Sequence, residues 1–345
     1  MKSTTKYVLN VLLIIVLSVL TAWYLSKTQI ITPTSLLSLK WTNCIFVVTW
    51  VYMCFAFLSL IEKHVYSSFC NYPYKTAFLT TVYGALGSAV SPLKSAHFPL
   101  KVYAQKTNGM TIAQTLTGIT KCQIIFSATS IVVYAVLMAI FIFSKAKLNI
   151  ADMTLPTFTV VGIGFVSNVS IFILLTLISR IDKLRTVILR LLAFIASIFN
   201  RKLNKEEFMQ KKTERLNLFK EQTSAIFSKF YLFIFPSLAY VLYMFLSCLA
   251  PYVSYLCVSG TGFSFNDCIR FYTCALALTY LVNVIPIPGG CVVAEFVFSV
   301  VFAPITGVYL SRTLLLWRFC TYYIPTTINL GIFVVSSIKS TKRNT

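Results

Sequence analysis

Acidic side chains are scarce in this sequence: 9 of the 345 residues are Asp or Glu, against 30 Lys and Arg. Charged residues of both signs make up 11% of the chain, whereas hydrophobic residues make up 57%. A soluble domain carries roughly 25% charged residues. The composition therefore excludes an ordinary soluble fold and predicts an all-α polytopic integral membrane protein.

The excess of basic residues gives a formal net charge of +21. In a soluble protein such a charge would suggest a nucleic-acid partner. Here most Lys and Arg residues fall in short segments between apolar runs, as the positive-inside rule predicts. We therefore expect no nucleic acid among the partners.

Several catalytic motifs are also missing. There is no G-x-x-x-x-G-K-[ST] loop, no H-E-x-x-H and no G-x-S-x-G, and the chain has only two histidines. These absences exclude nucleotide hydrolysis through a P-loop and make a zinc site or a serine-hydrolase site unexpected. The ten cysteines mostly lie inside apolar runs and form no C-x-x-C pair, which predicts small buried residues rather than disulfides. We expect no cofactor, no metal and no catalytic residue.

Long apolar runs predict the membrane spans. About 20 helical residues cross the hydrocarbon core, and six runs reach this length: 7–25, 42–61, 112–143, 156–179, 230–258 and 313–338. Two further apolar regions, 76–92 and 268–309, are shorter or broken. The prediction is about six full transmembrane helices plus two broken or re-entrant elements, equivalent to about eight spans. The first run lacks a small-x-small cleavage site and is expected to remain as a span.

The chain divides into two membrane halves, 1–179 with a broken element near 76–110 and 230–345 with a break at 286–290. Between them, 180–229 carries twelve Lys and Arg against five Asp and Glu. This segment is expected to form amphipathic helices that bind anionic lipid at the cytoplasmic surface, or to act only as a linker that sets orientation.

Lys and Arg placement also predicts the orientation in the cell membrane. Both termini are expected in the cytoplasm, together with three basic segments: 62–75, 94–106 and 180–229. This placement requires 76–92 to dip into the membrane and return, or to pair with the segment after Pro92.

The break at 286–290 is the most unusual local feature. Its two prolines and two glycines cannot continue a helix, although the flanking sequence is as apolar as a membrane span. Irregular backbone at membrane depth is tolerated only where it is buried in protein or lines a wet cavity. Because a second break lies near Pro92–Pro99 in the first half, the pair is typical of a transporter substrate site.

The first break resembles a signature of the lysylphosphatidylglycerol synthase transmembrane family, which runs roughly T-P-x-x-x-G-G-x-P-x-x-x-Y. Four positions carry the resemblance: Ser91, Pro92, Pro99 and Tyr103. Ala96 and His97 stand where the family has its glycine pair.

The second break is similar to the family's P-x-P-G-G-x-G-x-x-E. The matching residues are Pro286, Pro288, Gly289, Gly290 and Glu295, and Val292 replaces the later glycine. Downstream, the segment from Trp317 to Tyr323 resembles the family's W-R-x-x-x-Y-Y in the last span. The three motifs agree in order and spacing over nearly the whole chain.

The resemblance implies a flippase-like domain that moves a phospholipid, such as anionic or aminoacylated phosphatidylglycerol, or another lipid-linked headgroup between leaflets. In some members this domain precedes a soluble transferase that modifies phosphatidylglycerol with an amino acid from aminoacyl-tRNA. No such domain follows within these residues, so we expect no enzymatic activity of the chain alone. Two alternatives stay open: a membrane component of a phosphatidylglycerol lysyltransferase with a separate catalytic partner, and a non-transporting envelope scaffold. Oligomers also remain possible.

Glu295 and Arg318 are the expected centre of the second half. An ionisable group at membrane depth costs about 2.5–3.5 kcal/mol on insertion scales, which suggests a partner or a functional cavity. The two residues could form a buried structural ion pair, or they could face a lipid-headgroup cavity. In the second case Arg318, with a helix N-terminus near Cys291, would bind a phosphate. Glu295 would balance a cationic headgroup or take part in proton coupling.

Three further candidates surround the first break: Lys94, His97 and Lys101. They are expected to form either a solvated cytoplasmic loop or an entrance that collects headgroups, in which His97 could titrate near neutral pH.

Overall fold

The computed structural model describes residues 40–91, 94–144, 147–150 and 153–156, isolated positions between 162 and 173, and residues 231–284 and 288–344. The predicted first span, most of 156–179 and the basic segment 180–229 lie outside the described residues. So do Pro92 and Pro286.

The described helices confirm the all-α membrane class. They are α3 (Trp41–Ser67), α4 (Tyr74–Val90), α5 (His97–Thr107), α6 (Ile112–Ser144), α10 (Tyr231–Cys248), α11 (Ala250–Ser259), α12 (Phe265–Val284), α13 (Val293–Thr306), α14 (Leu310–Arg318) and α15 (Ile324–Asn344). A π-helical turn, Phe319–Tyr323, joins α14 to α15, and two 3-10 turns, Pro288–Gly290 and Gly307–Tyr309, flank α13. One small departure is an antiparallel hairpin of strands β1 (Lys147–Ile150) and β2 (Met153–Pro156).

Four stretches of the described chain are long and apolar enough to cross a membrane: Trp41–Ser67, Gln114–Phe143, Phe233–Ser259 and Val293–Ile338. The third corresponds to the predicted span 230–258 but contains a helix break at Leu249, between α10 and α11. Pro251 follows the break in the first turn of α11, where its missing N–H is tolerated.

The first broken region folds as a helical hairpin. Helix α4 ends at Val90, and α5 begins at His97 and returns along α4, against which it packs over much of its length. Eleven residues of α5 rise about 16 Å, so Lys94 at the tip and Lys106 near the base lie far apart. Most of the basic segment 94–106 is thus a helical arm that pairs with α4, which is the second of the two arrangements expected from the sequence; its cytoplasmic side stays a prediction.

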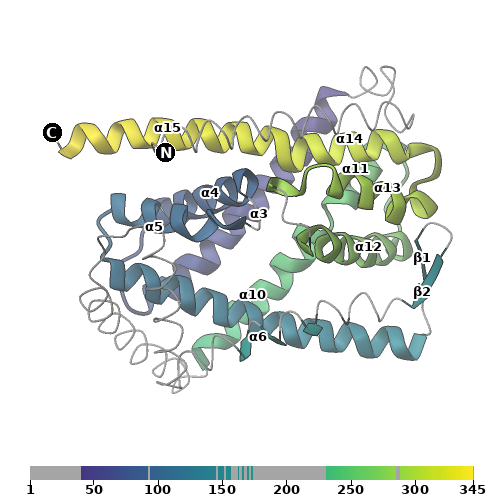
Figure 1. Cartoon of the computed structure of the whole chain (residues 1–345), viewed down its shortest axis with the longest axis horizontal. Helices are drawn as coiled ribbons and strands as arrows, with labels where there is room; N and C mark the ends of the chain where they lie inside the picture. The colour runs from purple at the N-terminus through teal and green to yellow at the C-terminus, as the bar shows by residue number, and fades with distance from the viewer. Residues whose placement is uncertain are drawn as a thin grey trace, which may run out of the picture.

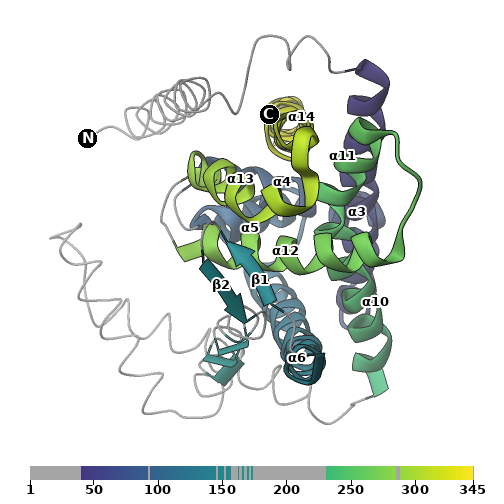
Figure 2. The same cartoon turned by 90° about the vertical axis from the view of Figure 1, so that its right-hand side faces the viewer.

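The second broken region forms a comparable hairpin from α12 and α13, which also pack against each other. The hairpins α4–α5 and α12–α13 lie beside one another in the middle of the molecule (Figure 1). Seen end-on, they are enclosed between α14–α15 on one side and α6 on the other, with α3, α10 and α11 along the flank (Figure 2). The two halves of the sequence therefore do not separate in space, since α10 and α11 both pack on α3.

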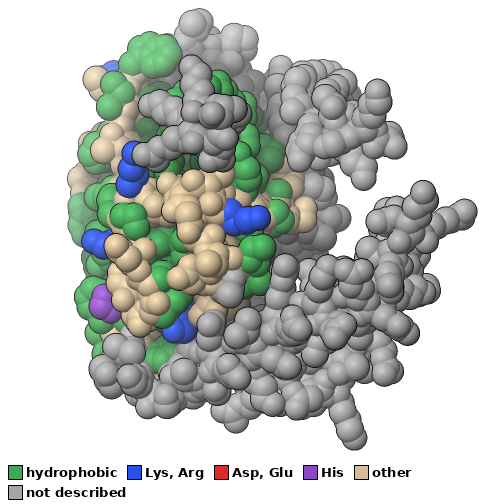
Figure 3. All heavy atoms as spheres, turned by 90° about the vertical axis from the view of Figure 1, so that its left-hand side faces the viewer, with side chains coloured by type: hydrophobic (Ala, Val, Ile, Leu, Met, Phe, Trp, Pro, Cys, Tyr) green, Lys and Arg blue, Asp and Glu red, His purple; other side chains and the backbone are tan. Residues whose placement is uncertain are grey.

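The outward surfaces of the long helices are apolar. Trp41, Val132 and Phe143 are among many large hydrophobic side chains left exposed on α3 and α6, as expected where a helix faces lipid. The end of the molecule nearest α5 carries scattered Lys, Arg and His side chains, and no acidic side chain of a described residue is visible there (Figure 3). Exposed basic residues at the base of the first hairpin include Lys63, Lys75 and Lys106.

Candidate headgroup cavity between two broken helices

Two consecutive glycines form the tip of the second hairpin. Gly289 and Gly290 have φ values of 59° and 63°, in the left-handed region that glycine adopts at little cost. A Cβ on Gly289 would lie 2.3 Å from the ring of Tyr322. The glycine therefore lets the π-helical turn pack directly against the hairpin backbone. Such π-turns are frequent at functional sites.

Val292 adopts φ 69°, where a β-branched residue is a backbone outlier. This is the position at which the family signature has its later glycine. The chain thus keeps a glycine-type backbone conformation while lacking the glycine. Helix α13 begins one residue later, at Val293.

Arg318, the last residue of α14, is held from three sides. Its Nε donates to Glu295 Oε1 over 2.5 Å, and its Nη2 donates to the Gly289 carbonyl over 3.0 Å. The guanidinium also lies 4.1 Å from the centre of the Tyr322 ring, in cation–π geometry. Arg318 is 6% exposed and Glu295 only 1%. The buried ion pair considered from the sequence is therefore formed, and it links the hairpin to the last span.

The first hairpin tip is closed by Ser91, which stands where the family signature has threonine. Its hydroxyl donates to the Gly87 carbonyl over 2.6 Å and accepts the Ala96 N–H over 2.9 Å. A Cβ on Gly87 would lie 2.4 Å from the Ala96 carbonyl oxygen, so only glycine permits this approach.

A cavity of about 540 Å³ lies between the two hairpin tips and the last span. Its walls come from both halves of the sequence and include Ser88, Ser91, Lys94, Thr279, Gly289, Gly290, Ala294, Arg318, Thr321, Tyr322, Thr326 and Asn329. The Tyr322 hydroxyl donates to the Ala89 carbonyl over 3.1 Å and so ties the last span to α4. The two breaks singled out in the sequence thus face one common cavity.

The charge of this cavity has one sign. Its charged lining residues are Lys94 and Arg318, and hydroxyl and amide groups supply the other polar atoms. Three of the nine acidic residues, Glu62, Asp267 and Glu295, are among the described residues, and none of the three lines the cavity. Glu295 lies against Arg318 but outside the lining. The described walls therefore favour an anion.

Other predicted site residues lie away from the cavity. Tyr103 is partly exposed and stacks on Tyr83, with ring centres 6.2 Å apart. Pro99 is exposed on α5, and Lys101 is buried. The structure places none of these three in the lining, and it places Pro288 in the 3-10 turn of the second tip.

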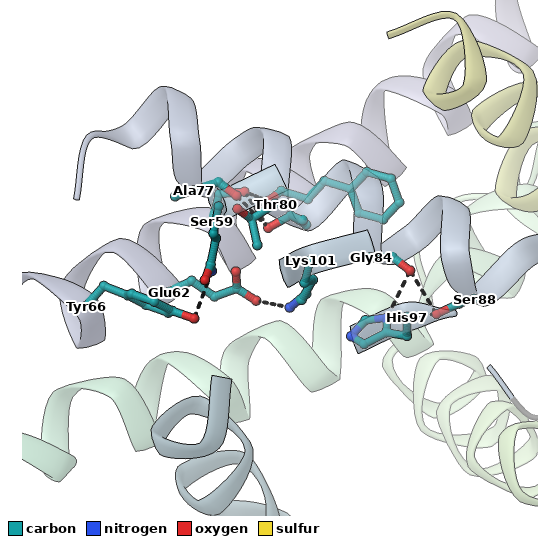
Figure 4. A network of polar contacts seen from close by, with 12 residues as sticks. Ser59, Glu62, Tyr66, Ala77, Thr80, Gly84, Ser88, His97 and Lys101 are labelled. Carbon is teal, nitrogen blue, oxygen red and sulfur yellow. Dashed lines mark hydrogen bonds and ion pairs between the residues drawn. The ribbon is translucent and has the colours of Figure 1, made fainter. Parts of the chain in front are cut away.

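The expectation of a solvated loop or an entrance is wrong for Lys101, because its side chain forms a second buried ion pair. Its Nζ lies 2.5 Å from Glu62 Oε1 (Figure 4). Glu62 was not among the residues expected from the sequence, because Lys63 and His64 follow it directly and make it look like the polar end of a span. One pattern in the sequence could have indicated this pair. Polar residues recur with a spacing of four on both helices, at positions 62 and 66 on α3 and at 101 and 105 on α5, which places each set on one helix face.

His97 packs over Gly84 next to Lys101 and bonds to the cavity wall. Its Nδ1 lies 2.8 Å from Ser88 Oγ and 2.9 Å from the Gly84 carbonyl oxygen (Figure 4). Because a carbonyl oxygen only accepts, Nδ1 carries the hydrogen. His97 itself is partly buried and does not line the cavity, whereas Ser88 does.

These features define a polytopic helical membrane protein with a largely apolar cavity that carries two basic groups between two interrupted hairpins. The chain belongs to the family described as the lysylphosphatidylglycerol synthase TM region, which it matches over residues 7–328. No curated protein and no solved structure matches the chain. Membership in this family fits a lipid-related role in a membrane.

Proposed function

We propose that this protein translocates an anionic phospholipid between leaflets, with the headgroup phosphate bound in the cavity between the hairpins. The observation that carries the proposal is the cavity's charge, which comes from Lys94 and Arg318. Family membership supports the lipid as the class of substrate. A volume of about 540 Å³ suits a headgroup, while the acyl chains remain in the bilayer.

Arg318 is suited to bind the phosphate. A guanidinium has five N–H donors in a planar fork that matches phosphate oxygens. Among the described residues, Nε donates to Glu295 and Nη2 to Gly289 and Cys291, and these bonds leave Nη1 for a ligand. Ala294, in the first turn of α13, also lines the cavity, so the positive end of that helix adds to the attraction.

Glu295 acts in this proposal as a positioning residue rather than as a ligand for a cationic headgroup. Its carboxylate fixes the plane of the Arg318 guanidinium, and it lies outside the cavity lining. The geometry thus favours anionic phosphatidylglycerol over its aminoacylated form, whose added ammonium group would meet no described carboxylate in the walls.

A leaflet-resolved assay in proteoliposomes tests the proposal. Fluorescent phosphatidylglycerol should become accessible to an external quencher much faster in wild-type vesicles than in protein-free vesicles. Arg318→Gln should slow this movement about tenfold or more, since a charge-assisted bond is lost. The exposed Arg312 on the same helix offers a matched control, and Arg312→Gln should stay within about twofold of wild type.

Lipid movement no faster with wild-type protein than without it would contradict the proposal and favour a scaffold. Lysyl transfer from charged tRNA by the purified chain alone would contradict the expectation that it is not an enzyme.

A further inference from the structure

The first hairpin contains an ion pair that the proposed headgroup site does not use. Glu62 on α3 is 3% exposed and Lys101 on α5 is 9% exposed. They lie outside the cavity lining, yet both are charged groups in the interior of a membrane protein. Burial of a charge pair is expensive and is weak evidence for stability alone.

Some hydrogen-bond acceptors around this ion pair have no donor among the described residues. Gln105 donates to Tyr66 and Tyr72 over 2.8 and 3.1 Å, but its Oε1 and the Glu62 Oε2 have no hydrogen-bond partner among the described residues. The titratable groups that interact with Glu62 come from α3, α5, α6, α10 and the turn before α4, and are Tyr66, Tyr72, Lys101, Cys122, Tyr240 and Tyr243. Lys101 is the only basic group among these. A free carboxylate oxygen in such a site is a place for one proton.

The two ion pairs differ in how firmly the cation is held. Arg318 has further bonds to the hairpin backbone and a ring contact, whereas the described residues give Lys101 a single polar partner, Glu62. Protonation of Glu62 at the free Oε2 therefore removes the counter-charge of Lys101, and it leaves one uncompensated positive charge in the interior.

That charge lies close to the cavity wall. Lys101 and His97 both pack over Gly84 on α4, at 2.7 Å and 3.0 Å from the position of a Cβ there. Ser88, one helical turn further along α4, bonds His97 and lines the cavity. Figure 4 shows the Glu62–Lys101 pair and, next to it, the bonds that join His97 to Gly84 and Ser88. An anion in the cavity would offset the positive charge left on Lys101.

We propose that Glu62 binds the proton that is carried together with the anionic lipid. This inference rests on the proposed function. The free Oε2 takes up one proton from one side and becomes a carboxylic acid, while the headgroup brings one negative charge into the cavity. Proton and lipid then move as a neutral pair, and the proton leaves on the other side when the headgroup does. Each ligand strengthens binding of the other by the same factor.

Proton uptake during lipid binding tests the inference. Purified protein in a weakly buffered detergent solution is titrated with short-chain phosphatidylglycerol, and a pH-indicator dye reports protons while fluorescence or calorimetry reports binding. Wild type should take up close to one proton per lipid. Its dissociation constant should rise by up to about tenfold per pH unit. Glu62→Gln should bind the lipid with proton uptake reduced at least about fivefold.

Proton uptake by Glu62→Gln equal to that of wild type would overturn the inference while leaving the proposed function intact. The double variant Glu62→Gln with Lys101→Met removes both charges and serves where the single variant does not fold; it should also bind lipid without proton uptake. Wild-type protein that binds no phosphatidylglycerol would contradict the proposed function itself. The two failures are distinguishable, because lipid binding and movement by the wild-type protein test the proposed function, whereas the difference in proton uptake between wild type and Glu62→Gln tests this inference.

Discussion

The two hairpins at the centre of this protein carry one buried ion pair each, but with the charges exchanged. In the α4–α5 hairpin the returning arm bears the cation, Lys101, and α3 before the hairpin supplies Glu62. In the α12–α13 hairpin the returning arm bears the anion, Glu295, and α14 after the hairpin supplies Arg318. Only the second pair puts a charged group into the cavity wall.

In the proposed scheme the two ion pairs have different tasks, headgroup binding at Arg318 and proton binding at Glu62. A cation that binds a headgroup must stay in one orientation, and Arg318 is fixed by Glu295, Gly289 and the Tyr322 ring. A group that takes up and releases a proton must be able to lose its partner, and Glu62 depends on a flexible lysine side chain. We therefore expect α12–α13 to hold the bound headgroup in a fixed geometry, and we expect the ion pair of α4–α5 to open and close as Glu62 gains and loses a proton.

The largest expected effect comes from breaking the ion pair of Glu295 and Arg318. Glu295→Gln leaves Arg318 buried without its counter-charge and should lower the free energy of unfolding by about 3–5 kcal/mol. Thermal unfolding in detergent, followed by intrinsic fluorescence, measures the loss. Adding Arg318→Met should recover much of this stability but no lipid binding.

The matching double variant in the first hairpin tests whether the two ion pairs differ in function. Glu62→Gln with Lys101→Met should also recover stability, yet it should retain downhill lipid movement. Loss of downhill movement in this double variant would show that both pairs serve binding, against the division proposed here.

The hairpin tips give a second, smaller set of effects. Gly289→Ala would place a Cβ 2.3 Å from Tyr322 at φ 59°, and Gly87→Ala would place one 2.4 Å from a backbone oxygen. Each should destabilise by about 2–4 kcal/mol, because overpacking and, for Gly289, backbone strain both oppose folding. Gly109→Ala is the matched control: at φ 86° with nothing within 4 Å it tests the backbone term alone and should cost about 1–2 kcal/mol. Equal losses at all three positions would mean that the tips are not closely packed.

The sequence predicted the membrane class and the two breaks, and it offered the pairing of Glu295 with Arg318 as one of two alternatives, since each depends on local composition or on the high cost of an isolated buried charge. It did not predict the pair of Glu62 and Lys101. These residues are separated by 39 positions and meet only because α5 folds back along α4 next to α3. Lysines near a span end usually reach water, so the pattern of basic residues favoured the wrong environment for Lys101.

Val292 provides the smallest expected effect and the most local test of the second hairpin. A β-branched residue at φ 69° is strained by about 1–2 kcal/mol, whereas glycine at this position costs about 0.5–1 kcal/mol of extra chain entropy. Val292→Gly should therefore raise the free energy of unfolding slightly, by up to about 1 kcal/mol. The neighbouring Val293→Gly, inside the helix, should lower it by about 1 kcal/mol or more. Side-by-side thermal unfolding of the two variants checks the sign of each change. A Val292→Gly protein that is destabilised as much as the Val293→Gly protein would mean that the Val292 side chain packs well enough to outweigh its backbone strain.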